Sequence, residues 1–228
     1  MTKKLLALLP LLLAGCGLAG TGTPLSASAP STLKAKQALD FQALYPLEAG
    51  TEWRYRTLQR NGDTPERPGQ EQRMLVTESK TEQGVTTAAV MRFYGDRQSP
   101  TTQAVRSAEG VVLSRYGQPE LGSLTVMKFP LTRGAKWGGR IKPNVTETVA
   151  YEGTASVTVP AGTFVAERLT HYLTYPNGTM DRLDYWYVSG IGLVKAVEGV
   201  TLDLGQGPKL NQVTAELTSF TPPTSRKN

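Results

Sequence analysis

From Tyr45 onward, apolar and polar residues alternate along the chain with a period of two. The clearest stretches are 85–94 (V-T-T-A-A-V-M-R-F-Y) and 212–218 (Q-V-T-A-E-L-T). Successive side chains of a β-strand point to opposite faces, so this period indicates strands with one buried face. Turn signals such as Asn61-Gly62 and Asn177-Gly178 separate the alternating stretches.

These signals predict strands near 51–58, 71–79, 85–94, 101–107, 110–117, 121–129, 144–151, 154–159, 163–175, 179–188, 191–198 and 209–220. No helix of ordinary length is predicted after Tyr45. The chain is therefore predicted to be an all-β protein with a curved antiparallel sheet, built as an open barrel or a sandwich.

The β domain is predicted to cover 45–221, followed by a C-terminal tail, 222–228. A short helix is predicted over 32–44, with Ser31 as its N-cap and Tyr45-Pro46 as its end. Before it, residues 17–31 are small, polar and rich in Pro and Gly, and they bury too little apolar surface to offset the entropy lost on ordering. With Cys16 they are predicted to form a flexible tether, 16–31.

One phrase occurs twice, as Y-P-L-E-A-G-T-E-W-R-Y-R at 45–56 and as F-P-L-T-R-G-A-K-W-G-G-R at 129–140, with five of twelve positions identical. A shorter echo, S-A-E-G-V-V at 107–112 and S-G-I-G-L-V at 189–194, follows in the same order. Together they favour a tandem duplication with units of about 45–118 and 129–200. The alternative is chance recurrence at turn-to-strand junctions. In both readings Trp53 and Trp137 are predicted structural anchors at one end of a core.

The first residues have the pattern of a bacterial export signal. Lys3 and Lys4 precede nine apolar residues, Leu5 to Leu13, too few to span a bilayer as a helix. Leu13-Ala14-Gly15-Cys16 resembles the lipobox of bacterial lipoproteins, and Cys16 is the only cysteine in the chain. The resemblance implies removal of residues 1–15 and lipidation of Cys16. The residue after the cysteine is Gly17 and not Asp. In this the chain resembles lipoproteins that are sent on to the outer membrane, in cells that have one. The alternative is an ordinary secretory signal.

Charge changes the picture little. The whole chain carries +6, and loss of Lys3 and Lys4 with the signal leaves 23 basic and 19 acidic side chains, a net charge of +4. The charges are scattered, with no run typical of a nucleic-acid-binding surface, so no nucleic-acid partner is predicted. We expect a folded domain tethered to a membrane by lipid, outside the cytoplasm in the bacterial envelope.

Candidate chemistry is sparse, and no catalytic residue, metal site or cofactor is predicted. His171 is the only histidine, and alternation places it on one strand face with Val165, Glu167, Leu169 and Leu173. A hydrogen-bonded or edge-exposed structural histidine is the favoured interpretation over a catalytic base. Asp181 and Asp184 are three apart on a strand and therefore point to opposite faces, which weakens any role as a paired acid and base.

The second repeat unit carries the most distinctive residues, V-T-V-P-A-G-T-F-V-A-E-R-L at 157–169 and Y-W-Y-V-S-G-I-G-L-V-K at 185–195. They resemble a group of uncharacterised bacterial envelope lipoproteins that carry a V-P-A-G-T-F hairpin and an aromatic strand ending in G-x-G-L-V-K. The resemblance implies a curved antiparallel sheet and no catalytic residues. Gly162 is predicted to adopt a positive φ in the hairpin turn.

The aromatic strand supplies the candidate contact residues, Trp186, Tyr185 and Tyr187. Alternation places Tyr185 and Tyr187 with Leu183 on the apolar inner face, together with Val165, Leu169 and Leu173. Trp186 falls on the opposite face among charged residues. Either Arg182 or a loop covers its indole, or Trp186 belongs to a partner-binding patch.

Three functions stay open from the sequence. The leading one is a non-enzymatic, lipid-anchored envelope protein that binds a partner protein or an apolar ligand. The second is a purely structural envelope component with a closed core, and the third is an enzyme of unrecognised type. A cavity in the concave face would favour a ligand, an exposed apolar patch would favour a partner, and a buried carboxylate beside His171 would favour an enzyme.

Overall fold

The computed structural model describes residues 40–115, 122–203 and 207–223. Over these ranges the chain forms a 14-stranded antiparallel sheet and a short 3-10 helix, and the predicted all-β fold class is confirmed. In chain order the elements are η1 (Phe41–Leu44), β1 (Glu52–Asn61), β2 (Arg67–Pro68), β3 (Gln72–Glu82), β4 (Val85–Tyr94), β5 (Arg97–Gln98), β6 (Thr102–Ser107), β7 (Gly110–Arg115), β8 (Ser123–Lys128), β9 (Lys136–Lys142), β10 (Val145–Val159), β11 (Gly162–Thr174), β12 (Met180–Val188), β13 (Gly192–Asp203) and β14 (Pro208–Thr221).

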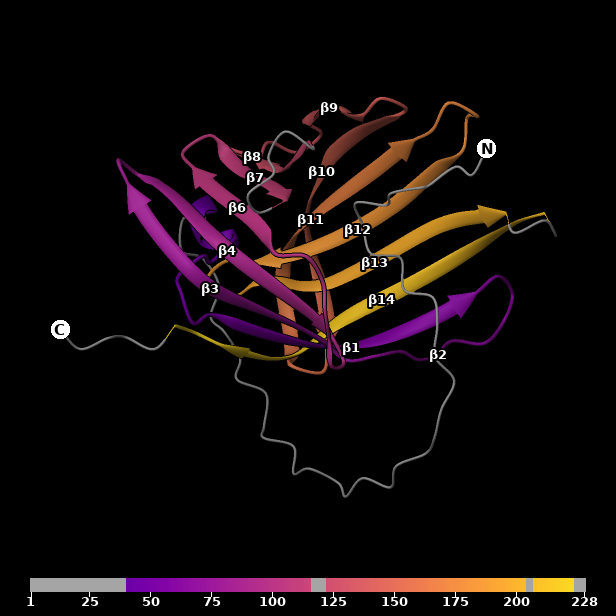
Figure 1. The fold of residues 1–228 in the computed structure, drawn as a ribbon, viewed down its shortest axis with the longest axis horizontal. Coiled ribbons are helices and arrows are strands. Elements are labelled where there is room, and N and C mark those ends of the chain that lie inside the picture. The colour runs from indigo at the N-terminus through magenta and orange to yellow at the C-terminus, as the bar shows by residue number, and fades with distance from the viewer. Residues whose placement is uncertain (1–39, 116–121, 204–206, 224–228) are drawn as a thin grey trace, which may run out of the picture.

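The sheet curves until its two ends meet (Figure 1). Its strand order is β8-β7-β6-β4-β3-β1-β14-β13-β12-β11-β10-β9, with β2 paired to β1 and β5 paired to β4. The end strands β8 and β9 contact each other. There the indole Nε1 of Trp137 donates a hydrogen bond to the carbonyl oxygen of Thr125 at 2.9 Å. The fold is thus a nearly closed barrel and not a two-sheet sandwich.

The barrel consists of two successive meanders. Strands β1, β3, β4, β6, β7 and β8 form the first, and β9 to β14 form the second. The repeated phrase makes the same turn in each: the amide of Thr51 donates to Glu48 at 3.1 Å, and that of Ala135 donates to Thr132 at 2.8 Å. The glycine before each donor has a φ of 90° or 82°. The tandem duplication stays a prediction, and these equivalent turns favour it.

The predicted strands omitted β9 and the two-residue strands β2 and β5, and divided β10 into two. β9 was not predicted, because Gly138 and Gly139 weaken its β signal. Gly138 is required there, since a Cβ atom would lie 2.2 Å from the carbonyl oxygen of Glu147 on β10. The strands predicted at 144–151 and 154–159 are one strand, β10, which continues through a register shift between Tyr151 and Gly153. Such a bulge bends a strand without ending it.

Two clusters of buried apolar side chains form the interior. The first joins β1, β3, β4, β6, β13 and β14 to the tip of the β10–β11 hairpin, and includes Trp53, Tyr55, Val76, Val157, Val159, Ala166, Val194 and Leu217. The second lies between β7, β8, β10, β11 and β12, and includes Leu44, Val111, Met127, Val149, Leu169 and Tyr187. Trp53 lies in the first cluster, and Trp137 packs against the second at half-burial.

The segment before β1 covers one end of the barrel. η1 begins at the N-cap Asp40, whose Oδ1 accepts from the amide of Gln42 at 3.0 Å. Leu44 is fully buried, and the carbonyl oxygen of Ala43 accepts from the amide of Gly190 at 2.8 Å. The predicted helix over 32–44 is described in its last part alone, where it is a 3-10 helix. Its first part lies outside the described residues.

One predicted core residue is on the surface. Leu169, Leu173 and Leu183 are buried as predicted, but Val165 is 73% exposed. β11 pairs with β12 from Glu167 onward, so residues 162–166 extend past the barrel wall. In this part of the hairpin, Phe164 and Ala166 pack on the first core cluster and Val165 faces the other way.

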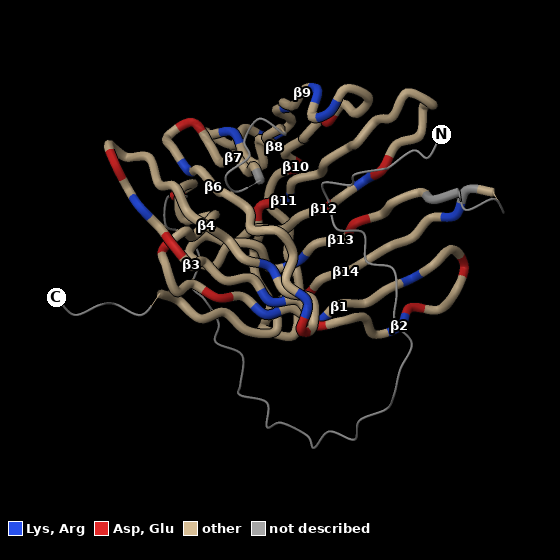
Figure 2. The backbone as a smooth tube through the Cα atoms, viewed as in Figure 1, with Lys and Arg blue, Asp and Glu red and all other residues tan. Residues whose placement is uncertain are grey.

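Charged residues of both signs lie along nearly all of the strands (Figure 2). Several form ladders across neighbouring strands: Glu216 of β14 bonds Arg56 of β1 at 2.7 Å and Lys195 of β13 at 2.9 Å. This interspersed pattern gives the described surface no large field of one sign.

Candidate functional site

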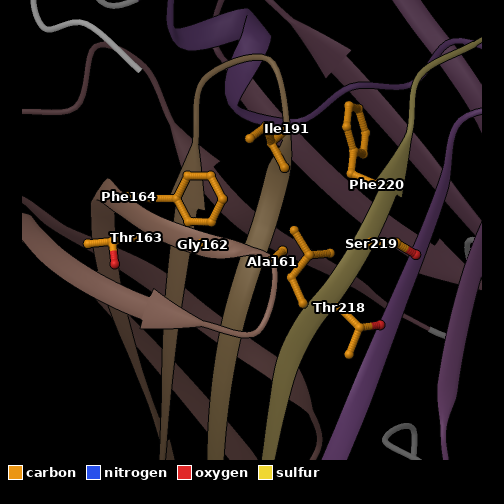
Figure 3. A pocket seen from close by; sticks show the side chains of 9 residues that line it. Ala161, Gly162, Thr163, Phe164, Ile191, Thr218, Ser219 and Phe220 are labelled. Carbon is orange, nitrogen blue, oxygen red and sulfur yellow. The ribbon is translucent and has the colours of Figure 1, made fainter. Parts of the chain in front are cut away.

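A shallow, uncharged groove lies where the β10–β11 hairpin tip meets the end of β14 (Figure 3). Its volume is about 360 Å³. Phe164 comes from the hairpin, Ile191 from the β12–β13 turn and Phe220 from β14, and all three are half-buried. The remaining lining residues are Ala161, Gly162, Thr163, Leu217, Thr218 and Ser219. We call this set the β14 groove.

The hairpin turn sets one wall of the β14 groove. Gly162 has a φ of 141°, so the predicted positive φ is confirmed. The turn lets the amide of Ala161 donate to the carbonyl oxygen of Leu217 at 2.9 Å, which ties the hairpin tip to β14. Phe164 then packs against the first core cluster. V-P-A-G-T-F thus acts as a brace between β11 and β14.

A split in the sheet sets the other wall. β13 and β14 pair from Asp203↔Pro208 to Lys195↔Glu216, beyond which the two strands separate. Side chains of β1 fill the separation: the Tyr55 hydroxyl donates to the carbonyl oxygen of Leu193 at 3.0 Å. Two residues nearer the groove on β1, Trp53 Nε1 donates to the carbonyl oxygen of Ile191 at 2.5 Å.

Two further contacts hold the floor of the split. The ring of Trp53 lies 5.9 Å from that of Phe220, centroid to centroid. Gly192 has a φ of 90°, and a Cβ atom there would lie 3.1 Å from Pro46 Cδ and 3.4 Å from Trp53 Nε1. Gly192, the second glycine of G-I-G-L-V-K, is therefore required both by its backbone conformation and by close packing.

The β14 groove is uncharged. Its lining is aliphatic or aromatic except for the hydroxyl groups of Thr163, Thr218 and Ser219, which are exposed. Such a surface suits an apolar or neutral polar contact, because a charged group placed in it would lose hydration without gaining a partner. The site has the properties of a docking surface and carries no reactive side chain.

The three sequence-predicted contact residues do not line this groove. Trp186 is half-buried, with the guanidinium of Arg168 5.3 Å from its ring centre, so Arg168 covers the indole where Arg182 had been expected. Tyr187 is 3% exposed and belongs to the second core cluster. Tyr185 is half-buried, and its hydroxyl donates to Glu198 at 3.0 Å. Of the three, Trp186 stays a candidate partner contact.

The interior phenols remain protonated. Burial, and to a smaller extent the neighbouring phenols of Tyr45 and Tyr55, raise the pKa of Tyr187 well above the usual 10.0. Burial and the carboxylate of Glu198 do the same to the pKa of Tyr185. The Tyr185 hydroxyl acts as a hydrogen-bond donor to Glu198.

His171 has the buried carboxylate that an enzyme would need. Its Nδ1 lies 2.8 Å from Oε1 of Glu147, and each residue is 3% exposed. Its ring meets that of Tyr185 edge to face at 4.9 Å. Nε2, however, has no hydrogen-bond partner among the described residues, so no hydroxyl or thiol stands in position as a nucleophile. Of the two structural interpretations left open by the sequence, the structure has the buried, hydrogen-bonded histidine and not the edge-exposed one.

Asp181 and Asp184 have separate sets of hydrogen-bond partners and do not form a pair. Asp181 is buried and accepts from the Tyr175 hydroxyl at 2.7 Å and from the amide of Thr201 at 2.9 Å. Asp184 instead bonds Thr170, Arg168 and Arg182. Both carboxylates thus accept hydrogen bonds that join neighbouring parts of the sheet.

Other candidate features are minor. A second hollow of about 200 Å³ lies between the β9–β10 turn and the end of β11, near Arg140 and Tyr175. Among residues 40–115, 122–203 and 207–223, no group of His, Cys, Asp and Glu side chains has the arrangement of a metal site. The same ranges contain no helix with the length and hydrophobicity that a bilayer crossing requires. Cys16 lies outside the described residues.

Sequence reasoning singled out the two motifs but not the groove that they build. Residues 160–164 and 190–192 are distinctive in the sequence, and both line or border the β14 groove. The contribution of β14, Leu217 to Phe220, was missed. Its signal was an aromatic residue at the end of the last strand, just before Pro222 and Pro223.

No family model and no curated protein matches the chain. Among solved structures it is similar to a protein from Bacteroides fragilis, predicted to be exported and having a YmcC-like fold, with 13% identity and a TM-score of 0.51 over 78% of this chain and 98% of that one. A predicted lipoprotein from Parabacteroides distasonis has 14% identity, a TM-score of 0.48 and the same coverages, 78% and 98%. The hypothetical lipoprotein YmcC of Escherichia coli has 12% identity and a TM-score of 0.31 over 72% and 83%. At these identities the likeness concerns the fold, and the barrel has the architecture of the YmcC-like structure from Bacteroides fragilis.

Proposed function

We propose that this protein is a lipid-anchored, non-enzymatic component of the bacterial envelope that binds a partner protein through the β14 groove. The observation that carries the proposal is the uncharged groove at the point where the two distinctive motifs meet. Its lining combines the half-buried side chains of Phe164, Ile191 and Phe220 with exposed hydroxyl residues, a mixture that suits contact with a neutral protein segment. The barrel interior is instead filled by the two core clusters, which favours a surface partner over an apolar ligand inside.

The lipobox supports the anchor in this proposal. Two acyl chains suffice for stable attachment, since each buried CH₂ contributes about 0.8 kcal/mol. We expect Cys16→Ala to move the protein from the membrane to soluble fractions and to abolish incorporation of labelled fatty acid. Undiminished labelling would exclude lipidation at Cys16.

Site-specific photo-crosslinking tests the groove. A benzophenone amino acid at Ser219, which lines the groove, should form an adduct with one envelope protein in intact cells. The same group at Met180, which is 54% exposed and does not line the groove, is the matched control. Adducts at both positions or at neither would contradict the proposal, and the second result would favour a purely structural component.

Trp186 supplies a second surface for the same test. Trp186 packs in part against the first core cluster, and Arg168 lies over its ring. We expect Trp186→Ala to leave the fold nearly intact, because the side chain is only half-buried. If the Ser219 adduct disappears in this variant, the partner also contacts the Trp186 face. If the variant unfolds, Trp186 belongs to the core.

A further inference from the structure

We propose that the partner contributes an extended, uncharged segment that adds to the open edge of β14 as a further β-strand. This inference rests on the proposed function and states its mode of binding. It follows from the backbone at the split in the sheet and from the side chains beside it.

The last part of β14 has a strand on one side. β1 pairs with β14 as far as Glu52↔Thr221, whereas β13 stops at Lys195↔Glu216. On that open side, the backbone hydrogen bond seen in the described chain is the one from Ala161 to Leu217. Residues 218–221 therefore form an unpaired strand edge, which is a template for another extended chain.

The facing edge, formed by the β12–β13 turn and the start of β13, is not available in the same way. The carbonyl oxygens of Ile191 in the turn and Leu193 in β13 already accept hydrogen bonds from the side chains of Trp53 and Tyr55. A segment entering the split would thus find partners on β14 alone. This asymmetry makes addition to β14 the arrangement that satisfies the added backbone without displacing a core side chain.

The side chains beside the edge define the segment. Alternate residues of an added strand would point toward Phe164, Ile191 and Phe220. At least one of these residues of the added segment is therefore apolar. The lining has no charged side chain, and a charge entering it would be desolvated without a partner. The occupant is therefore a neutral segment of a partner protein with apolar residues at alternate positions. A second copy of this chain, joined edge to edge, is the competing occupant.

The test uses ten-residue peptides selected from a random displayed library against the detergent-solubilised lipidated protein. Peptides that fit the groove should be uncharged and alternate apolar with polar residues. In the synthetic peptides, N-methylation of every second amide should weaken binding at least tenfold, and methylation of the other amides should change it less than twofold. Only a chain paired along one edge shows this period of two.

Two protein variants locate the binding. Ile191 and Ser189 lie in the same β12–β13 turn, but Ile191 lines the groove and Ser189 is exposed outside it. We expect Ile191→Lys to weaken peptide binding at least tenfold and Ser189→Lys to leave it within twofold. Both variants add a lysine to the same turn, so the difference isolates the groove.

Failure to select such peptides, an N-methyl pattern without a period of two, or equal losses in the two lysine variants would overturn strand addition. So would a concentration-dependent dimer that Ile191→Lys dissociates, since the second copy would then hold the edge. If the Ser219 adduct persists in cells under any of these results, the partner docks in another way and the proposed function stands. If the adduct is also absent, both fail.

Discussion

At the scale of single residues, several glycines are required for different reasons although they share one backbone conformation. Gly162 and Gly138 have φ values of 141° and 137°. A Cβ atom at Gly162 would lie 3.5 Å from the ring of Phe164, an ordinary contact. At Gly138 it would lie 2.2 Å from the carbonyl oxygen of Glu147, on the neighbouring strand.

We therefore expect Gly162→Ala to destabilise the fold by about 1–3 kcal/mol through backbone strain alone. Gly138→Ala should destabilise it more, because β9 must also move away from β10. Urea unfolding of the two variants measures the difference. Equal losses would show that β9 shifts freely at the barrel seam.

The buried pair of His171 and Glu147 is a second residue-scale feature. Glu147→Ala removes the carboxylate that pairs with His171 Nδ1, while Nε2 already has no partner among the described residues. Leaving a buried donor unpaired costs about 1–3 kcal/mol, and the free energy of unfolding should fall by that amount or more. Glu147→Gln keeps an acceptor oxygen, so the free energy of unfolding should fall less in this variant. Unchanged stability in both variants would contradict a structural role for the pair.

At the scale of elements, cross-strand ion pairs join neighbouring strands of the second meander to β1. Burial acts to raise the pKa of Glu216, but hydrogen bonds from Lys195 and Arg56 outweigh it and hold that pKa below the usual 4.5. Asp184 behaves alike: bonds from Thr170, Arg182 and Arg168 outweigh burial and hold its pKa below 3.8. Both carboxylates are thus more stable as anions in the folded chain than in the unfolded one.

The sign of the pH dependence follows. A lowered folded-state pKa stabilises the fold at pH values above the unfolded pKa, and this contribution is lost as pH falls through the folded value. We expect the contribution of these two groups to the free energy of unfolding to be constant above about pH 5. It should decline as the pH falls below their usual pKa values of 4.5 and 3.8. The double variant Asp184→Asn, Glu216→Gln should show a shallower decline in urea titrations at pH 5, 4 and 3. An unchanged slope would exclude these ladders as its source.

At the scale of the whole molecule, the two meanders close on each other through β1–β14 and through β8–β9. η1 and the segment up to β1 cover one barrel end and bury Leu44 and Leu47 completely. Within the described residues, the N-terminal part of the chain thus stabilises the barrel through η1 and the segment that follows it. Residues 17–31 have a composition that supplies no comparable apolar surface.

We expect a chain that begins at Thr32 to unfold at the same temperature as one that begins at Gly17. Scanning calorimetry of the two forms checks this expectation. A decrease of several degrees in the shorter form would show that the tether packs on the barrel.

Most of the fold was predictable because its signals are local. Alternation over 85–94 and 212–218 indicates strands wherever those residues lie in space, and β4 and β14 contain them. Gly162 likewise needed a positive φ for a reason within its own turn. The lipobox at Cys16 is local as well, and its lipidation stays a prediction.

The sequence by itself thus determined the fold class, most of the strands and the two distinctive motifs. The tertiary structure decided what depends on residues far apart: that the sheet closes as a barrel, that β10 runs unbroken through its bulge, and that Val165 is exposed beyond the β12 edge. It also decided the β14 groove, since Phe164, Ile191 and Phe220 meet only where β13 and β14 separate. The physical reason is that side-chain alternation is set within each strand, whereas closure, register and splitting of a sheet are set by the backbone pairing between strands.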